Sequence, residues 1–381
     1  MKRLVSPIVI LLSGVLGSFA AGLAFTATAS RVDAEAASRF RPYLQNRAKS
    51  PAFSAAILVV SKGKVVIREA HGMADFELGV PLQPDHVFRI GSLTKPFTAA
   101  AILRLRDQGR LKLSQSVCEF IHPCPTAWRP ATVAHLLSHT SGLPDLFGDL
   151  EAVPAAATCA EVDRVVGKAG ALAPQSSAGS EYSYSNFNYV LLGCIIEAVT
   201  GETWEAFLQA QVLAPAGMTD TRYDDVWAVV PRRVHGYEMK DGQLRITRYT
   251  DHAAYAAGGL RSTLDDLRRW HEAYRAGSIL SRATVEEALR PGLGNYGYGW
   301  QTTTHFGRRV HNHTGGLRGF ASHLAFYPDE ELLIVILSNI EDENTKGTAC
   351  DIAALALGVA SVPTGTPDWI QHSNGERCGA P

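Results

Sequence analysis

Two serines in this chain stand three residues before a lysine, a spacing that can place a nucleophile beside a base. One pair is Ser92 and Lys95, in the stretch FRIGSLTKPF, and the other is Ser61 and Lys64. A serine needs such a neighbour because its hydroxyl is a weak nucleophile until a base takes its proton. The elements that carry each pair decide which of the two can do chemistry.

The pair Ser61 and Lys64 is predicted to lie in a surface turn. The runs SAAILVV (54–60) and VVIREA (65–70) are rich in β-branched residues and flank the Gly-containing segment SKGK. This pattern indicates a β-hairpin with the lysine at its tip in solvent. We therefore interpret this pair as part of a turn.

The pair Ser92 and Lys95 is predicted to begin a buried helix. Residues 97–105 are helix formers that are apolar almost all round, and Gly109 is placed to end the helix. Pro96 is tolerated there only in the first turn, so Ser92 lies near the helix start and Lys95 one turn on. Two interpretations of this lysine stay open. It forms an ion pair, or desolvation and the helix N-terminus lower its pKa until it serves as a base.

Two further segments offer polar groups that a reactive serine needs. Tyr184 and Asn186 precede an apolar helical run in EYSYSNFNYVLLGCIIEAVTG (181–201), where helix capping is the plain interpretation. His313 and Thr314 stand in HNHTGGLRGF (311–320), which by itself indicates a Gly-rich turn before a strand. A Gly-x-Ser-x-Gly elbow and a Walker-type phosphate loop are both missing.

Taken in order, Ser-x-x-Lys, Tyr-x-Asn and His-Thr-Gly resemble the motifs of the serine β-lactamase and penicillin-binding-protein superfamily. The likeness is strongest to its class C and D-alanyl-D-alanine carboxypeptidase branch, and it extends over residues 36–360. The segments that carry it are 72–105, 135–145, 179–201, 213–221, 256–270, 296–300 and 313–339.

The resemblance implies a role for each matching residue. Ser92 would be the acylated nucleophile, and Lys95 would take its proton. Tyr184 would hydrogen-bond both and pass the proton to the leaving group, while Asn186 would orient the lysine and the substrate amide. The backbone N–H groups of Ser92 and Gly316 would bind the oxyanion. No metal or organic cofactor is implied.

The resemblance also implies substrate-binding roles for His313, Thr314 and Gly315. His313 stands where many members carry a lysine that faces a substrate carboxylate, so we expect a small-molecule or peptide substrate with a carboxylate. An unperturbed imidazole titrates near ~6.5, so the preference for that carboxylate should fall as pH rises through the histidine's pKa. Arg318 is a second candidate for this positive charge.

Composition limits the partners and the location. The 381 residues carry a formal net charge of −1, which argues against nucleic acid or an anionic membrane surface as a partner. Lys2, Arg3 and a long apolar run lead to Ala27-Thr28-Ala29, which predicts a signal peptide at 1–29 or an uncleaved anchor. We expect an exported protein, periplasmic or extracellular, with a tail at 361–381. The sequence leaves the oligomeric state open.

The chain has six cysteines, an even number that permits disulfides in an exported protein. Cys118 and Cys124 are predicted to close a small loop, with a zinc site that adds His122 as the alternative. The pairing of the others, at 159, 194, 350 and 378, stays open. Two histidine pairs, His135 with His139 and His311 with His313, have metal-like spacings but lack the further ligands.

The predicted fold is mixed α/β. Strands from both ends of the chain share one antiparallel sheet with helices on both faces, and a mainly helical lobe, roughly 96–255, is inserted within a domain spanning 36–360. We expect peptidase chemistry of the D-alanyl-D-alanine type. β-Lactamase or carboxylesterase activity on the same site, and a catalytically silent binder of wall fragments, are the alternatives.

Overall fold

The structure, a computed structural model, describes residues 37–145, 159, 173–225, 227–247 and 254–359. Contacts divide the chain into residues 1–31 and 32–381, and the fold below is that of the second unit. The predicted signal peptide at 1–29 and the tail at 361–381 lie outside the described residues. Within the described ranges, no helix is both long and apolar enough to cross a membrane.

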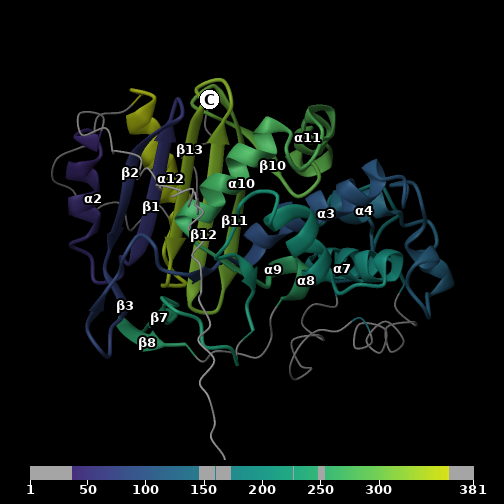
Figure 1. The fold of residues 1–381 in the computed structure, drawn as a ribbon, viewed down its shortest axis with the longest axis horizontal. Helices are drawn as coiled ribbons and strands as arrows, with labels where there is room; N and C mark the ends of the chain where they lie inside the picture. The colour runs from purple at the N-terminus through teal and green to yellow at the C-terminus, as the bar shows by residue number, and fades with distance from the viewer. Residues whose placement is uncertain (1–36, 146–158, 160–172, 226, 248–253, 360–381) are drawn as a thin grey trace, which may run out of the picture. The chain divides into compact units, whose positions relative to one another are not determined.

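Strands from both ends of the chain form one sheet of six, in the order β10-β11-β12-β13-β1-β2 (Figure 1). Their bounds are β1 (Ala55–Ser61), β2 (Lys64–His71), β10 (Gln301–His305), β11 (Arg308–Leu317), β12 (Phe320–Tyr327) and β13 (Leu332–Ser338). Every neighbouring pair is antiparallel, and β1 joins the two ends of the chain by pairing with β13, Ala55 opposite Ser338. The predicted antiparallel sheet is confirmed.

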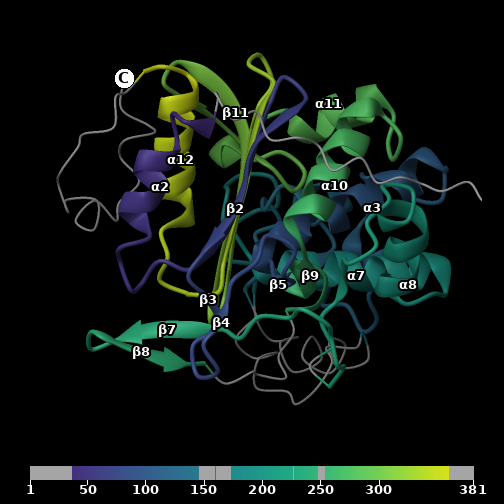
Figure 2. The same cartoon turned by 60° about the vertical axis from the view of Figure 1, so that its left-hand side comes forward.

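Both faces of the sheet are apolar because both are covered by helices. Ile57 and Ile334 belong to the core cluster under α2 (Arg41–Arg47) and α12 (Thr345–Ala356), whereas Leu58 and Val335 belong to the opposite cluster. Figure 2 shows α2 and α12 side by side on their face, with α10 (Leu264–Ala276) and α11 (Arg282–Leu289) across the sheet.

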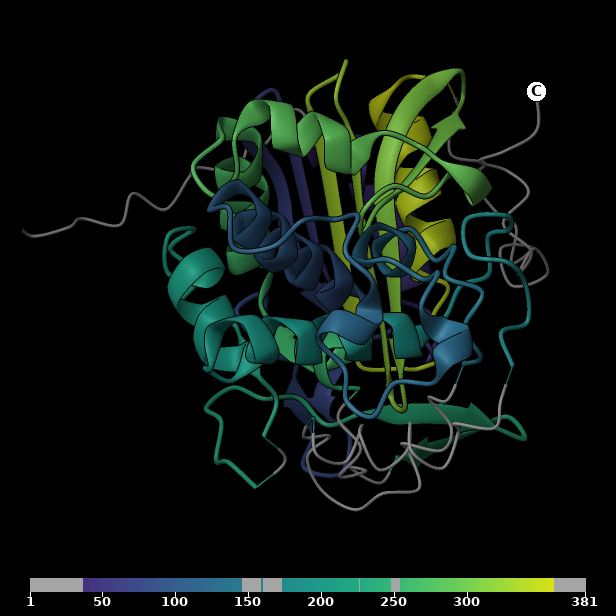
Figure 3. The same ribbon diagram turned by 90° about the vertical axis from the view of Figure 1, so that its right-hand side faces the viewer.

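The described elements between residues 95 and 258 are mainly helical (Figure 3). The helices of this range are α3 (Lys95–Asp107), α4 (Val133–Leu137), α7 (Asn186–Thr200), α8 (Trp204–Leu208), a π-helical turn (Gln209–Leu213) and α9 (Tyr255–Gly258), with the 3₁₀ turns η2 (Val117–Glu119) and η3 (Thr126–Trp128). Two further 3₁₀ turns lie outside this range, η1 (Gly91–Thr94) and η5 (Leu293–Asn295). The remaining strands are short: β3 (Met73–Asp75), β4 (Val80–Pro81), β5 (Phe88–Arg89), β6 (Arg222–Tyr223), β7 (Tyr237–Lys240), β8 (Gln243–Ile246) and β9 (Leu260–Ser262).

The interpretation of Ser61 and Lys64 as a hairpin agrees with the structure. Lys64 is exposed at the turn between β1 and β2, although Ser61 is partly buried. Ser61 pairs with Leu332, at the end of the sheet where β12 turns into β13. Gly316 pairs with Ala321 at the opposite end of β12. The two Ser-x-x-Lys segments therefore serve different parts of the fold.

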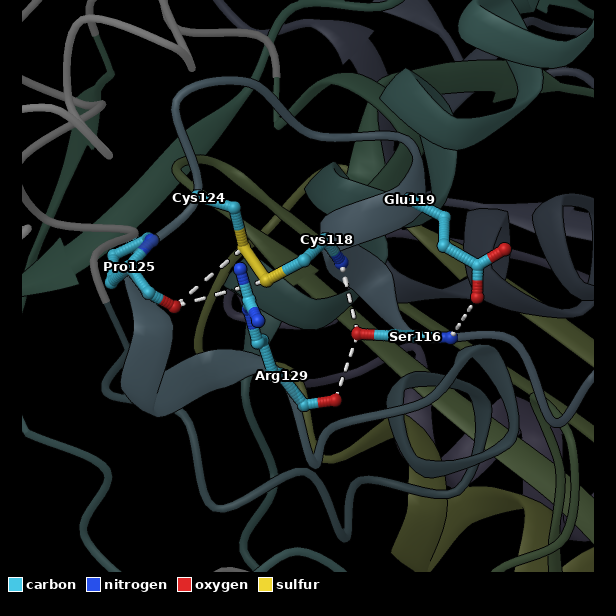
Figure 4. The surroundings of a disulfide bond; sticks show 6 residues. All are labelled: Ser116, Cys118, Glu119, Cys124, Pro125 and Arg129. Carbon is cyan, nitrogen blue, oxygen red and sulfur yellow. Dashed lines mark hydrogen bonds between the residues drawn. A yellow bond between two sulfur atoms is a disulfide. The ribbon is translucent and has the colours of Figure 1, made fainter.

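The predicted disulfide between Cys118 and Cys124 is present, with the two Cα atoms 5.3 Å apart (Figure 4). The Ser116 hydroxyl organises this loop, because it accepts the Cys118 N–H and donates to the Arg129 carbonyl. The zinc alternative is wrong here, since both sulfur atoms are bonded to each other. Cys159 is bonded to Cys194, Cys350 is also disulfide-bonded, and no described cysteine is free.

Candidate active site

Ser92 lies in the 3₁₀ turn η1, directly before helix α3. The turn can approach strand β11 closely because its first residue is Gly91. Gly91 has φ +52°, and a Cβ there would stand 2.8 Å from the Gly316 nitrogen. Only glycine tolerates both this conformation and this contact. The close approach brings Ser92 and Gly316 into the lining of one cleft.

Lys95 is the first residue of α3 and is fully buried, as predicted for this helix. Its Nζ is hydrogen-bonded to Ser92 Oγ at 2.9 Å, to Asn186 Oδ1 at 2.8 Å and to the Ala257 carbonyl at 2.8 Å. Burial holds the pKa of the amine well below its ordinary value, and the charge of Asp145 opposes this only in part.

The neutral amine that burial favours has two N–H groups and one lone pair. The Asn186 and Ala257 oxygens can only accept, so they take the two N–H groups and the lone pair faces Ser92 Oγ. A lone pair directed at a serine hydroxyl can receive its proton. These contacts favour the base over the ion-pair interpretation of Lys95.

Tyr184 completes the cluster from the segment before α7. Its hydroxyl donates to Ser92 Oγ at 3.0 Å, and its ring centroid lies 4.9 Å from Lys95 Nζ. The residue as a whole is 39% exposed, yet burial of the phenol raises its pKa above the ordinary value, because the hydroxyl that titrates points into the cluster. At neutral pH the tyrosine therefore keeps its proton and donates it to Ser92.

A histidine that the sequence analysis set aside lies beneath this cluster. His139 is fully buried, and its Nδ1 accepts the Ser185 N–H at 3.2 Å, directly after Tyr184. Its ring lies 4.4 Å from the Tyr184 ring and 4.7 Å from that of Tyr296. Burial holds the pKa of the His139 imidazole well below the usual range, so the ring is neutral and packs against the two tyrosines. His135 instead accepts the N–H of Thr132 as a helix cap.

His313 lies inside strand β11, where the sequence analysis expected a turn. The strand continues through the glycines because it pairs with β12 as far as Leu317. His313 Nδ1 lies 2.6 Å from the Thr314 carbonyl, so it must carry the proton, and Nε2 then accepts from Tyr296 OH at 2.9 Å. Burial lowers the pKa of His313 to about 3.

The expected titration of His313 near neutral pH is therefore wrong. A ring with both nitrogens engaged and a pKa of about 3 carries no charge in the working range. Arg318 does not replace that charge in the cleft, because it is exposed in the turn after β11 and is not a lining residue. His313 and Thr314 do line the cleft, whereas Gly315 is packed against Ile90, whose carbonyl oxygen would lie 2.0 Å from an added Cβ.

The cleft has a volume of about 370 Å³. Its lining comprises Ser92, Tyr182, Tyr184, Tyr296, Gln301, His313, Thr314 and Gly316. The sequence analysis did not identify Tyr182, Tyr296 or Gln301 as site residues. Tyr296 begins the segment YGYGW, which carried the resemblance, and that was the one signal for it. The tyrosine hydroxyls and the side-chain amide of Gln301 supply polar atoms to the cleft. Its described lining contains no lysine or arginine.

The site is that of a serine hydrolase, because the serine hydroxyl contacts a buried amine and a tyrosine hydroxyl. The fold, an antiparallel sheet with helices on both faces, is of the β-lactamase and transpeptidase type. The protein belongs to the Beta-lactamase family, whose model matches residues 40–358. The resemblance drawn from the ordered motifs is thereby confirmed.

Relatives within this family differ in activity. The chain is 30% identical over 319 residues to penicillin-binding protein 4* of Bacillus subtilis, covering 76% of this chain and 69% of that protein. It is 30% identical over 342 residues to a D-aminopeptidase of Gluconobacter oxydans, covering 83% of this chain but only 61% of the relative. An octameric penicillin-binding protein homologue from Pyrococcus abyssi superimposes with a TM-score of 0.75 at 27% identity, over 84% of this chain and 77% of that one.

Proposed function

We propose that this protein is an exported serine peptidase that forms an acyl-enzyme on Ser92 with peptides of the D-alanyl-D-alanine type. The observation that carries this proposal is the hydrogen-bonded cluster of Ser92, Lys95, Tyr184 and Asn186. The likeness to a penicillin-binding protein and to a D-aminopeptidase supports a donor with a D-configured residue. The disulfides support export, because disulfides persist in oxidising compartments.

The contacts suggest how the acylation proceeds. Lys95, neutral because it is buried, takes the proton of Ser92 as its Oγ bonds to the substrate carbonyl carbon. The carbonyl oxygen becomes an oxyanion that accepts from the backbone N–H groups of Ser92 and Gly316. When the bond to the leaving amine breaks, the Tyr184 hydroxyl gives the amine a proton and recovers one from Lys95. Water then releases the acyl group by the same steps in reverse.

A second candidate function is the hydrolysis of D-aminoacyl amides or esters that lack a free carboxylate. One observation favours it: His313 is neutral, and the described lining of the cleft contains no arginine or lysine. A substrate carboxylate would find hydroxyl and amide donors there, from Thr314 and Gln301, but no fixed positive charge. The two candidates share the acylation step and differ in the group beyond the scissile bond.

Intact-protein mass after exposure to three acyl donors tests the proposal. A D-Ala-D-Ala peptide, a penicillin and a p-nitrophenyl ester should each add mass to the same serine, and the rate at which the adduct clears ranks the activities. We expect turnover of the peptide to exceed that of the other two donors. Slow clearance of every adduct except that of the ester would contradict peptidase function and support the second candidate.

The matched variants are Ser92→Ala and Ser61→Ala, which change the serine of each Ser-x-x-Lys. Covalent labelling by a fluorophosphonate or a penicillin should disappear in Ser92→Ala and persist in Ser61→Ala. Labelling that survives in Ser92→Ala would place the nucleophile on another residue.

A further inference from the structure

A second cavity, larger than the catalytic cleft, lies between helices α10 and α11 and the strands β10, β11 and β12. Its volume is about 1090 Å³. The cavity and the catalytic cleft both have lining residues on strands β10 and β11, but they share none of them. Thr302 and His311 line the cavity, and Gln301 and His313 line the cleft. The mechanism proposed above uses none of the cavity's side chains.

The floor of this cavity is formed by buried polar and aromatic side chains, among them Thr302, His311 and His271. Thr302 Oγ1 donates to the Leu289 carbonyl at 2.8 Å, so it accepts from His311 Nδ1 at 2.8 Å. His311 Nε2 is then the ring nitrogen that can accept a further hydrogen bond. His271 is 8% exposed and makes no hydrogen bond with any described residue. Its ring centroid lies 4.2 Å from that of Phe326, with the two planes tilted by 55°, so the floor has an aromatic part.

The rim of the cavity is positively charged. Its arginines come from α10, α11, the segment after α11 and β11, namely Arg275, Arg282, Arg290 and Arg309. The guanidinium of Arg275 lies over the Phe326 ring, 4.6 Å from its centroid. Only Arg309 has a carboxylate partner, Asp329 at 3.1 Å, within the part of the chain that the structure describes.

The acidic residues of the lining only partly offset this charge. Glu272 is held by Arg268 at 2.7 Å, outside the lining, and Glu286 is exposed on α11. The positive potential reaches the floor, because Arg275 adds to burial in lowering the pKa of His271 to about 3. An anion in the cavity would therefore meet uncompensated arginines and a floor able to bind a flat apolar group.

We propose that this cavity is a second binding site, for a small organic anion with an aromatic or short acyl body. The body packs on Phe326 and Val285, where it is removed from water. Its carboxylate, sulfonate or phosphate group accepts hydrogen bonds from the rim arginines, whose planar guanidinium groups suit such anions. The described lining of the catalytic cleft offers no such charge, so the two sites select different ligands. This inference is independent of the proposed peptidase activity.

Fluorescence titration with 8-anilinonaphthalene-1-sulfonate, an aromatic anion, tests the proposal on the full-length folded protein. The double variant Arg275→Gln/Arg290→Gln should raise the Kd of this probe at least about ten-fold, because each guanidinium–anion contact is a charge-assisted hydrogen bond. The matched control is Arg245→Gln, an exposed arginine of the β7–β8 hairpin, which should leave the Kd unchanged.

Two further measurements distinguish this site from non-specific adsorption of the probe and from binding in the catalytic cleft. 2-Naphthoate should displace the probe, and the neutral 2-naphthalenemethanol should not, if charge is part of the recognition. The variant Ser92→Ala should bind the probe as the native protein does. Equal Kd values for the double variant and the Arg245→Gln control, or equal displacement by the neutral competitor, would overturn the proposal.

Discussion

Replacing Lys95 by methionine tests whether this lysine is neutral in the folded protein. The lysine is fully buried, and burial holds its pKa well below the ordinary value. In the unfolded chain a lysine titrates near ~10.4. As pH falls below that value, the unfolded chain takes up a proton that the folded chain does not. The folded state therefore loses stability until the pKa of the folded state is reached, and the penalty is constant below it.

The size of this effect follows from linkage. Within the window between the two pKa values, one proton separates the folded and unfolded states, so the free energy of unfolding changes by about 1.4 kcal/mol per pH unit. Lys95→Met removes the titrating group. The stability of the variant relative to the native protein should therefore rise by that slope as pH falls. The three lost hydrogen bonds add an offset that does not depend on pH within this window.

Urea denaturation at pH 7.5, 8.5 and 9.5 measures this slope, with m-values compared to confirm two-state behaviour. The control is Lys64→Met, which removes the exposed lysine of the other Ser-x-x-Lys and should show no such slope. Acylation of Lys95→Met should fall by about 10²–10⁴-fold, the usual contribution of a general base. A stability difference that is the same at all three pH values would show that Lys95 stays protonated in the folded protein, and would refute its role as the base.

Three further changes follow from the described contacts. Reducing or replacing Cys118 and Cys124 should lower the free energy of unfolding by at most about 2–3 kcal/mol in urea denaturation, because the closed loop is short; an unchanged value would argue against the bond in solution. Burial lowers the pKa of His313 to about 3, so the ring should not titrate between about pH 5.5 and 8.5. The ratio of kcat/KM for a carboxylated substrate to kcat/KM for a neutral ester should therefore stay level over this range, and His313→Lys should raise this ratio. A falling ratio would mean that the ring titrates. Gly91→Ala should cost about 1–2 kcal/mol of stability and cut kcat about 10²–10³-fold, because the new Cβ displaces Gly316 from the oxyanion. Unaltered kcat would exclude that donor.

The sequence predicts well what local patterns control. The apolar run after Pro96 indicated a buried helix with Ser92 near its start, and the structure has η1 and α3 there. Strand runs at both ends of the chain indicated one shared sheet, and β1 pairs with β13.

Local patterns did not predict the environment of His313. Glycines in HNHTGGLRGF indicated a turn, but pairing with β12 keeps these residues in a strand. The strand places His313 beside Tyr296, a residue from the segment after α11, and this contact helps to keep the imidazole neutral. An unperturbed pKa was therefore the wrong starting point for an imidazole whose burial and contact with Tyr296 depend on tertiary packing.

The chemistry of Lys95 depends on three segments that are distant in sequence. Its amine is held by Asn186 on α7, 91 residues on, and by the Ala257 carbonyl of α9, 162 residues on. Neither contact follows from helix or strand periodicity, so the spacing Ser-x-x-Lys alone left an ion pair and a base equally open. Burial makes the neutral amine the favoured form, while the two acceptors take its N–H groups and direct its lone pair at Ser92. The same spacing at Ser61 leaves its lysine exposed at the turn of a hairpin. A spacing acquires a function only where the rest of the chain encloses it.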